Sequence, residues 1–270
     1  MERTFQLVKG VGPFLERDLW AKGFDGWASL EAAVAKGASP LNARLGDKLL
    51  TAIAAARAAL AGGDLAALAA LVPSREHWRL YPHFAAEAAF FDLEADGEDE
   101  ITVGGLLDRD GVASFRRGLD LDGLPARLAT RPIWVTFNGA VFDVPVLRRS
   151  FPGTPRPPVH LDLRVILRKV KLHGGLKALE DKLGLGRPPH LRGVKGLDAI
   201  RLWREFKEHG RVDALRLLVE YNLYDAINLR TLMEWSVNAI AEAWAWDVPR
   251  APVFERGEVL YDVSRLVLAL

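Results

Sequence analysis

The first 75 residues carry apolar positions at helical spacing and lack the runs that predict strands. Pro13 suits the first turn of a helix, which we expect to end before Gly23. Ser39–Pro40 predicts the start of a later helix through the Ala-rich region. The tract 52–72 is too weakly apolar for a membrane span, so it is expected to form two helices of a small all-α domain.

After residue 84 the pattern changes to strand-like apolar runs. The first three predicted strands are 85–93, 101–107 and 112–117. The last two are joined by Asp108–Gly111, which favours an antiparallel meander. The elements predicted next are a helix at 121–130, a strand at 133–137, a helix at 144–149 and a long helix at 213–235. This order predicts an α/β domain, a mixed sheet with flanking helices.

Proline and aromatic residues between the two patterns suggest a domain boundary. We therefore expect a helical domain at 1–75, a linker at 76–84, an α/β domain at 85–245 and a C-terminal extension at 246–270. A hairpin is expected in the extension, around Arg256–Gly257.

Charge is unevenly distributed along the chain, although the formal net charge is only +1. Residues 84–122 contain eleven acidic and three basic side chains, a net charge of −8, and residues 145–217 contain seventeen basic and seven acidic, a net charge of +10. An acidic pocket beside a basic tract suits a metal-using protein with a polyanionic ligand, and solvated helices give the same counts. The absence of cysteine excludes disulfides and thiolate chemistry, and the N-terminus has no signal-peptide pattern, so a cytoplasmic location is expected.

Two carboxylates, Asp92 and Glu94, interrupt the apolar run of the first strand. Because side chains alternate along a strand, both point to one face, about 7 Å apart. Buried together they need a cation between them, and oxygen ligands suit Mg²⁺ or Mn²⁺. The alternative is a solvated strand end that leads into the acidic turn 98–100.

Two more aspartates occupy positions that suit a site. Asp143 follows a buried strand and a glycine turn, where it can project over the end of the sheet or cap the next helix. Asp225 lies one turn after Tyr221 on the apolar face of the long helix. A buried aspartate needs a partner, and a tyrosine–aspartate hydrogen bond is the structural alternative.

The three patterns in chain order are D-x-E at Asp92–Glu94, N-x-x-x-F-D at Asn138–Asp143 and Y-x-x-x-D at Tyr221–Asp225. Together they resemble the DEDD exonuclease superfamily, which has the ribonuclease-H-like (DnaQ-like exonuclease) fold, and the chain is most similar to the YprB-like predicted exonucleases. Further similarity lies in His160–Leu163, Leu176–Gly184 and Glu220–Asp225. The resemblance covers about residues 85 to 235.

This resemblance implies a 3′–5′ exonuclease that hydrolyses single-stranded or frayed nucleic acid by a two-metal mechanism. The implied ligands of two Mg²⁺ or Mn²⁺ ions are Asp92, Glu94, Asp143 and Asp225. Tyr221 would orient the attacking water, and Glu220 stands where the histidine subtype has its base, which favours the tyrosine subtype. Ala95–Asp96 departs from the small hydroxyl residues usual there. That departure favours the alternative, a catalytically silent nucleic-acid-binding or scaffold protein that keeps the nuclease fold.

Nucleic-acid contacts are expected in both domains. Val8–Gly12 resembles the turn of the helix-hairpin-helix family, in which Lys9, Gly10 and Gly12 would contact a phosphate through backbone N–H groups. Such units also serve as protein contacts. In the α/β domain the expected contacts are Asn138, Arg168, Lys169, Lys171 and Lys177. These residues do not distinguish DNA from RNA, and they indicate no membrane and no particular protein partner.

Overall fold

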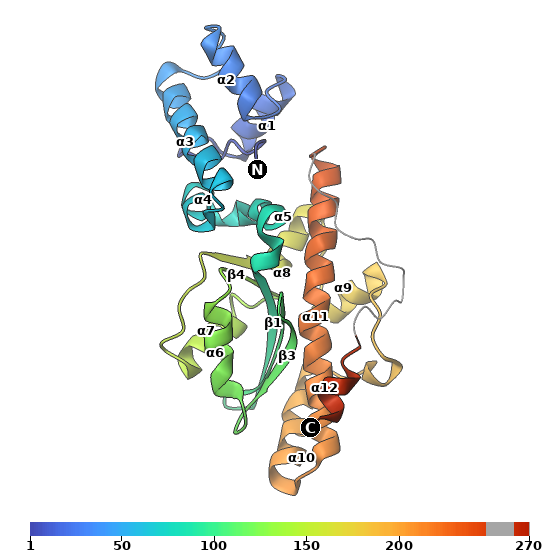
Figure 1. Cartoon of the computed structure of the whole chain (residues 1–270). Coiled ribbons are helices and arrows are strands. Elements are labelled where there is room, and N and C mark those ends of the chain that lie inside the picture. The colour runs from blue at the N-terminus through green and yellow to red at the C-terminus, as the bar shows by residue number, and fades with distance from the viewer. Residues whose placement is uncertain (247–261, 270) are drawn as a thin grey trace. The chain divides into compact units, whose positions relative to one another are not determined.

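The structure is a computed structural model, and it describes residues 1–246 and 262–269. The expected hairpin around Arg256–Gly257 lies outside the described residues. The chain divides into two compact units, Met1–Phe84 and Ala85–Leu270 (Figure 1). Among the described residues, no helix combines the length and the apolar character needed to cross a membrane.

The first unit is helical, as the sequence predicts. Its elements are α1 (Pro13–Ala21), α2 (Trp27–Ala35), α3 (Ala43–Ala61), α4 (Leu65–Leu71), the 3-10 helix η1 (Ser74–Leu80) and α5 (Tyr81–Phe84). The start predicted at Ser39–Pro40 is wrong, because Asn42 caps α3 by accepting a hydrogen bond from the backbone N–H of Leu45.

Residues 76–84, expected to be a linker, are helical and belong to the first unit. Arg79 is buried and donates to both carboxylate oxygens of Glu16 at 2.8 Å and to Glu76 at 2.9 Å. A buried guanidinium needs such partners, and Glu16 lies 63 residues earlier in the chain. The prolines that suggested a linker therefore border a segment that is held in the core of the unit.

The second unit contains a five-stranded mixed sheet, which confirms the predicted fold class. Its strands are β1 (Ala88–Ala95), β2 (Ile101–Asp108), β3 (Gly111–Arg116), β4 (Ile133–Thr136) and β5 (Val159–Asp162). They lie in the order β3-β2-β1-β4-β5. β1, β2 and β3 form the expected antiparallel meander, and β4 and β5 add in parallel to β1.

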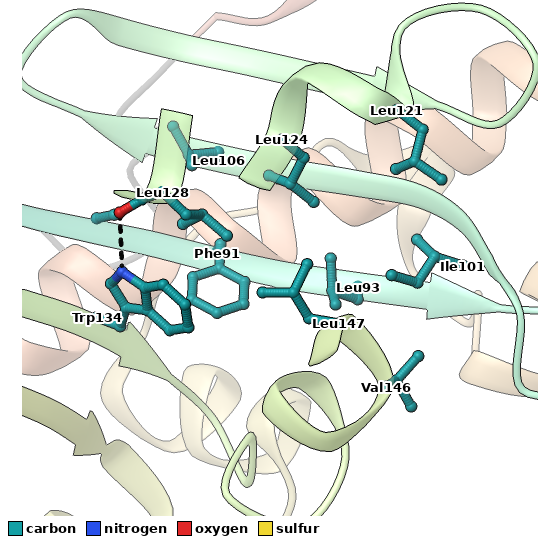
Figure 2. Close-up of a cluster of buried hydrophobic side chains, with 11 residues drawn as sticks. Phe91, Leu93, Ile101, Leu106, Leu121, Leu124, Leu128, Trp134, Val146 and Leu147 are labelled. Atoms are coloured by element: carbon teal, nitrogen blue, oxygen red, sulfur yellow. Dashed lines mark hydrogen bonds between the residues drawn. The ribbon is translucent and has the colours of Figure 1, made fainter. Parts of the chain in front are cut away.

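The helices of this unit lie on both faces of the sheet (Figure 1). The α-helices are α6 (Leu124–Ala129), α7 (Asp143–Ser150), α8 (Leu163–Ile166), α9 (Leu176–Leu183), α10 (Gly196–His209), α11 (Val212–Ala243) and α12 (Ser264–Leu268). The 3-10 helices are η2 (Ala85–Glu87), η3 (Leu121–Gly123), η4 (Leu167–Val170) and η5 (Pro189–Leu191). α6 and α7 cover one face, where Phe91 and Trp134 meet edge to face, with ring centroids 5.5 Å apart (Figure 2). α11 covers the other face along β1 and β2, and it continues eight residues beyond its predicted end.

Because successive side chains of β1 alternate, this packing separates two sets of residues. Phe91 and Leu93 enter the core beneath α6 and α7 (Figure 2). Asp92 and Glu94 therefore face α11. The apolar core fixes which way the acidic pair points.

Candidate metal and nucleic-acid site

Asp92 and Glu94 meet Asp225 of α11, and carboxylate oxygens of the three residues lie within 4.8 Å of one another. They come together because Gly105, opposite Asp92 in β2, has no side chain to keep α11 away from the sheet. Asn222 fixes this contact. Its Nδ2 donates to the backbone oxygen of Asp92 at 3.1 Å and to Oδ2 of the same residue at 2.9 Å. The group formed by Asp92, Glu94 and Asp225 is called the acid group below.

The two members of the acid group that come from β1, Asp92 and Glu94, are not neutralised by cationic side chains of the described residues. Burial, reinforced by the charge of Asp225, raises the pKa of both Asp92 and Glu94 well above the usual range. In the described part of the chain neither of these two carboxylates has an ion-pair partner. Oxygen donors crowded in this way are the ligand type that Mg²⁺ and Mn²⁺ prefer.

Asp143 lies beside the acid group and not within it. It is the first residue of α7, and Phe142 occupies the cap position, so the capping alternative is wrong. Asp143 Oδ1 accepts a hydrogen bond from the backbone N–H of Leu93 at 2.9 Å, which ties α7 to β1. Burial raises the pKa of Asp143 to about 7. Its charge in turn raises the pKa of Asp92, so the two carboxylates share one electrostatic environment.

Two cationic side chains hold Asp225. Lys177 Nζ lies 3.0 and 3.2 Å from its carboxylate oxygens and 4.2 Å from the centre of the Tyr221 ring. Arg187 pairs with Asp225 and, at 2.6 Å, with Glu180. Although burial opposes it, these carboxylates raise the pKa of Arg187, which therefore stays charged. The partner that a buried aspartate needs is thus supplied by Lys177 and Arg187.

Tyr221 faces the same acidic environment from α11. The residue is buried, and burial together with the charge of Asp225 raises the pKa of its hydroxyl. The hydroxyl therefore keeps its proton at neutral pH and can act as a hydrogen-bond donor.

Asn138 lies in a basic cavity at the end of β4. It adopts a left-handed backbone with φ of 62°, which its backbone N–H supports by donating to Asp162 Oδ1 at 2.9 Å. Its side-chain oxygen accepts from Arg164 at 2.8 Å. Together with Arg168 and His173, these two side chains line a cavity of about 430 Å³. The cavity places cations next to the strand end that leads to Asp143.

The remaining residues expected to contact nucleic acid do not line this cavity. Lys169 and Lys171 belong to η4 and its C-terminal cap, and Lys171 is exposed. In the first unit, Lys9 and Gly10 are exposed in a turn closed by a backbone hydrogen bond from Val11 to Val8. Gly10 has φ of 111°, which favours glycine, but residues 1–12 contain no helix before this turn. Gly12 precedes α1 as its cap residue.

Three residues that shape the site were not predicted. Arg187 was seen only as one member of a basic tract, and no local pattern pairs it with Asp225. Asn222 lies three residues before Asp225, a spacing that places both on one helix face. Gly105 carries the clearest signal, because glycine inside a strand marks close approach of another backbone.

Comparison with known proteins agrees with this geometry. A family model described as RNase_H superfamily matches residues 89–237, more than half of the chain. The chain belongs to the ribonuclease H superfamily. Among curated proteins and among solved structures, none matches it.

Proposed function

We propose that the chain is a divalent-metal-dependent 3′–5′ exonuclease of the tyrosine-type, YprB-like DEDD group, acting on single-stranded or frayed DNA or RNA. The observation that carries this proposal is the convergence of Asp92 and Glu94 from β1 with Asp225 from α11. Residues 133 positions apart are brought within 4.8 Å at a site with too little positive charge to balance them. Structural packing alone gives no reason for this arrangement.

The donor set fits a hard divalent cation, because every candidate ligand atom is a carboxylate oxygen and burial disfavours the uncompensated charges. Two Mg²⁺ or Mn²⁺ ions held by Asp92, Glu94, Asp143 and Asp225 would activate the attacking water and neutralise charge on the phosphodiester. Asn222 keeps Asp92 in place, and the Leu93 N–H does the same for Asp143.

In this proposal other side chains of the chain bind the nucleic acid and orient the attacking water. The protonated Tyr221 hydroxyl is available to orient the attacking water by a hydrogen bond. Lys177 has an ammonium group partly exposed to solvent beside Asp225, where it can also meet a phosphate oxygen. Arg164 and Arg168, with Asn138, line the cavity at the end of β4 and suit the neighbouring backbone of a bound strand.

The proposal is tested with a labelled oligonucleotide in Mn²⁺. We expect D92N and D225N each to lose at least about a hundredfold in rate, since removing an outer-shell partner alone costs roughly 10–100-fold. Asp213→Asn is the matched control, because this exposed aspartate lies on the same helix and should leave the rate unchanged. Oligonucleotides blocked at either end test polarity, and only a 3′ block should stop degradation.

Calorimetric titration with Mn²⁺ gives a readout that does not need turnover. Wild type and D213N should bind the ion, whereas D92N and D225N should bind it weakly. If D92N or D225N degrades the oligonucleotide at the wild-type rate, or if a chelator has no effect, the assignment is wrong.

One observation favours the second candidate, a silent nucleic-acid-binding or scaffold protein. Lys177 and Arg187 both engage Asp225, so this carboxylate already has positive partners. The residues that follow Glu94 also depart from the family pattern, and Asp96 pairs with Arg117 at 2.7 Å. A clean preparation that binds oligonucleotides, takes up no Mn²⁺ and cleaves nothing would establish this function instead.

For the first unit we propose a supporting contact with nucleic acid at the turn of Lys9, Gly10 and Gly12, in the manner of a helix-hairpin-helix turn. The exposure of Lys9 and Gly10 supports this, since backbone N–H groups at an exposed glycine turn can meet a phosphate. The contact would raise affinity and take no part in the chemistry.

A further inference from the structure

A second basic cavity lies beside α7, and no residue of the sequence-predicted site belongs to it. Its volume is about 660 Å³. Three arginines and one histidine line it, and no acidic side chain does: Arg148, Arg149, Arg156 and His160. The other walls are apolar and rich in proline, which gives the cavity rigid sides.

Within the part of the unit that the structure describes, two of the three arginines of this cavity, Arg148 and Arg156, lack the carboxylate partners that several other arginines have. Arg127 and Arg131, for example, both pair with the buried Asp108. Among the described residues neither Arg148 nor Arg156 has an ion-pair partner, and Arg148 Nε is buried without a hydrogen bond. Positive charge gathered without compensation favours an anionic ligand.

The other two polar side chains of the cavity, Arg149 and His160, do not neutralise this positive charge. Arg149 reaches only Asp99, at 3.3 Å, and both side chains are exposed, so the pair is weak. His160 Nε2 is within 2.8 Å of Thr136 Oγ1, and burial lowers the pKa of His160. The histidine is therefore neutral at physiological pH, and the arginines supply the charge.

The cavity lies next to the turn that carries Asp143. Ala140 and Val144 form part of its wall, and Asp143 lies between them in the chain. Residues 137 and 138 of the same turn line the basic cavity that contains Arg168. One turn thus carries Asp143 and borders two basic cavities.

We propose that the cavity of Arg148 and Arg156 is a second phosphate subsite, which holds a backbone phosphate of the same nucleic-acid strand whose terminal phosphodiester lies at the acid group. Guanidinium groups suit this role because they bind phosphate oxygens in pairs of parallel hydrogen bonds. The inference rests on the proposed function for the identity of the ligand, and its test does not require cleavage.

The test measures binding of a fluorescent single-stranded oligonucleotide by the full chain in EDTA, over a range of salt concentrations. R148Q/R156Q should weaken binding by roughly tenfold or more, as expected when hydrogen bonds to a charged group are removed. The slope of log K against log salt should become shallower by about 0.7 for each phosphate that the variant no longer neutralises. R148K/R156K keeps the charges and should retain most of the salt slope.

The matched control is R201Q/R204Q, which removes two exposed charges from α10. It should bind as the wild type does, and melting curves of all variants check folding. Equal weakening in R148Q/R156Q and the control would mean that only overall charge matters and would overturn the subsite. Unchanged affinity and slope in R148Q/R156Q would overturn it as well.

A second arm titrates adenosine 5′-monophosphate. If the double substitution abolishes binding of the mononucleotide and leaves the oligonucleotide unaffected, the cavity holds a small free anion and the strand proposal fails. Failure of the proposed function is distinguishable: a wild-type chain that binds the oligonucleotide but never cleaves it overturns the nuclease assignment, while R148Q/R156Q still decides the subsite.

Discussion

Replacing Gly105 by alanine tests how α11 brings Asp225 to the sheet. An added Cβ would lie 2.6 Å from Asn222 Oδ1 and 3.0 and 3.2 Å from the backbone oxygen and carbon of the same residue. The side-chain amide can rotate away, but the backbone of α11 can retreat only if the helix moves. We therefore expect G105A to displace α11 from β2 by several tenths of an ångström.

This overpacking lowers the free energy of unfolding of G105A. Extra methyl groups in a packed interior cost about 1–3 kcal/mol. In a domain of this size each kcal/mol lowers Tm by roughly 2–4 °C, so we expect a loss of about 2–12 °C. The displacement also weakens the two hydrogen bonds from Asn222 to Asp92 and separates Asp92 from Asp225. We therefore expect G105A to have a lower affinity for Mn²⁺ as well as a lower Tm.

Gly104→Ala provides the control in the neighbouring position of β2. Its added Cβ would meet the side-chain tips of Leu124 at 2.9 Å and Leu93 at 3.1 Å on the opposite face, and both tips can turn away. Melting curves and Mn²⁺ calorimetry on both variants give the comparison. If G105A melts and binds Mn²⁺ like the wild type, α11 does not depend on this glycine and the reasoning fails.

Three further predictions test the charges and the first unit. R187M should lose roughly 3–5 kcal/mol of stability because it leaves the buried Glu180 without a cation and Asp225 with Lys177 alone, and E180Q in that background should restore part of the loss in urea melts. Because the folded pKa of Asp143 is raised from 3.8 to about 7, the metal-free protein should lose stability as pH rises from about 4 to 7, by at most about 4 kcal/mol from this residue. D143N should flatten that dependence in melts with EDTA, and an unchanged slope would refute the cause. A chain shortened to 85–270 should keep kcat, show a higher KM and a shallower salt dependence of binding; identical binding would remove the turn at Gly10 from the nucleic-acid contacts.

The antiparallel meander of β1, β2 and β3 and the acidic pair could be predicted from the sequence because both depend on local patterns. The fifth strand, β5, and the order of the strands in the sheet were not predicted. Alternation along β1 fixes the face of Asp92 and Glu94, and helical spacing places Asp225 on the apolar face of α11. These patterns do not depend on which distant segment packs against them. The family model over residues 89–237 agrees with the fold they predict.

The rest depends on pairings between distant residues, which local spacing does not contain. Arg187 pairs with Asp225 across 38 positions, so it looked like one more solvated cation. Arg79 was assigned to a linker because the prolines around it are local, whereas Glu16 is remote. In the same way, Ser39–Pro40 matched a capping pattern, but Asn42 lay closer to the first apolar turn of α3 and supplies the cap.

The separation of the acid group along the chain has a consequence for biosynthesis. Asp92 and Glu94 lie on a strand that is made early, while Asp225 lies on a helix made more than a hundred residues later. At about 5–20 residues per second, several seconds or more pass between the two on the ribosome. Throughout that interval the nascent chain has only two of the three members of the acid group and cannot form the site. Premature release before α11 therefore gives fragments without the complete acid group.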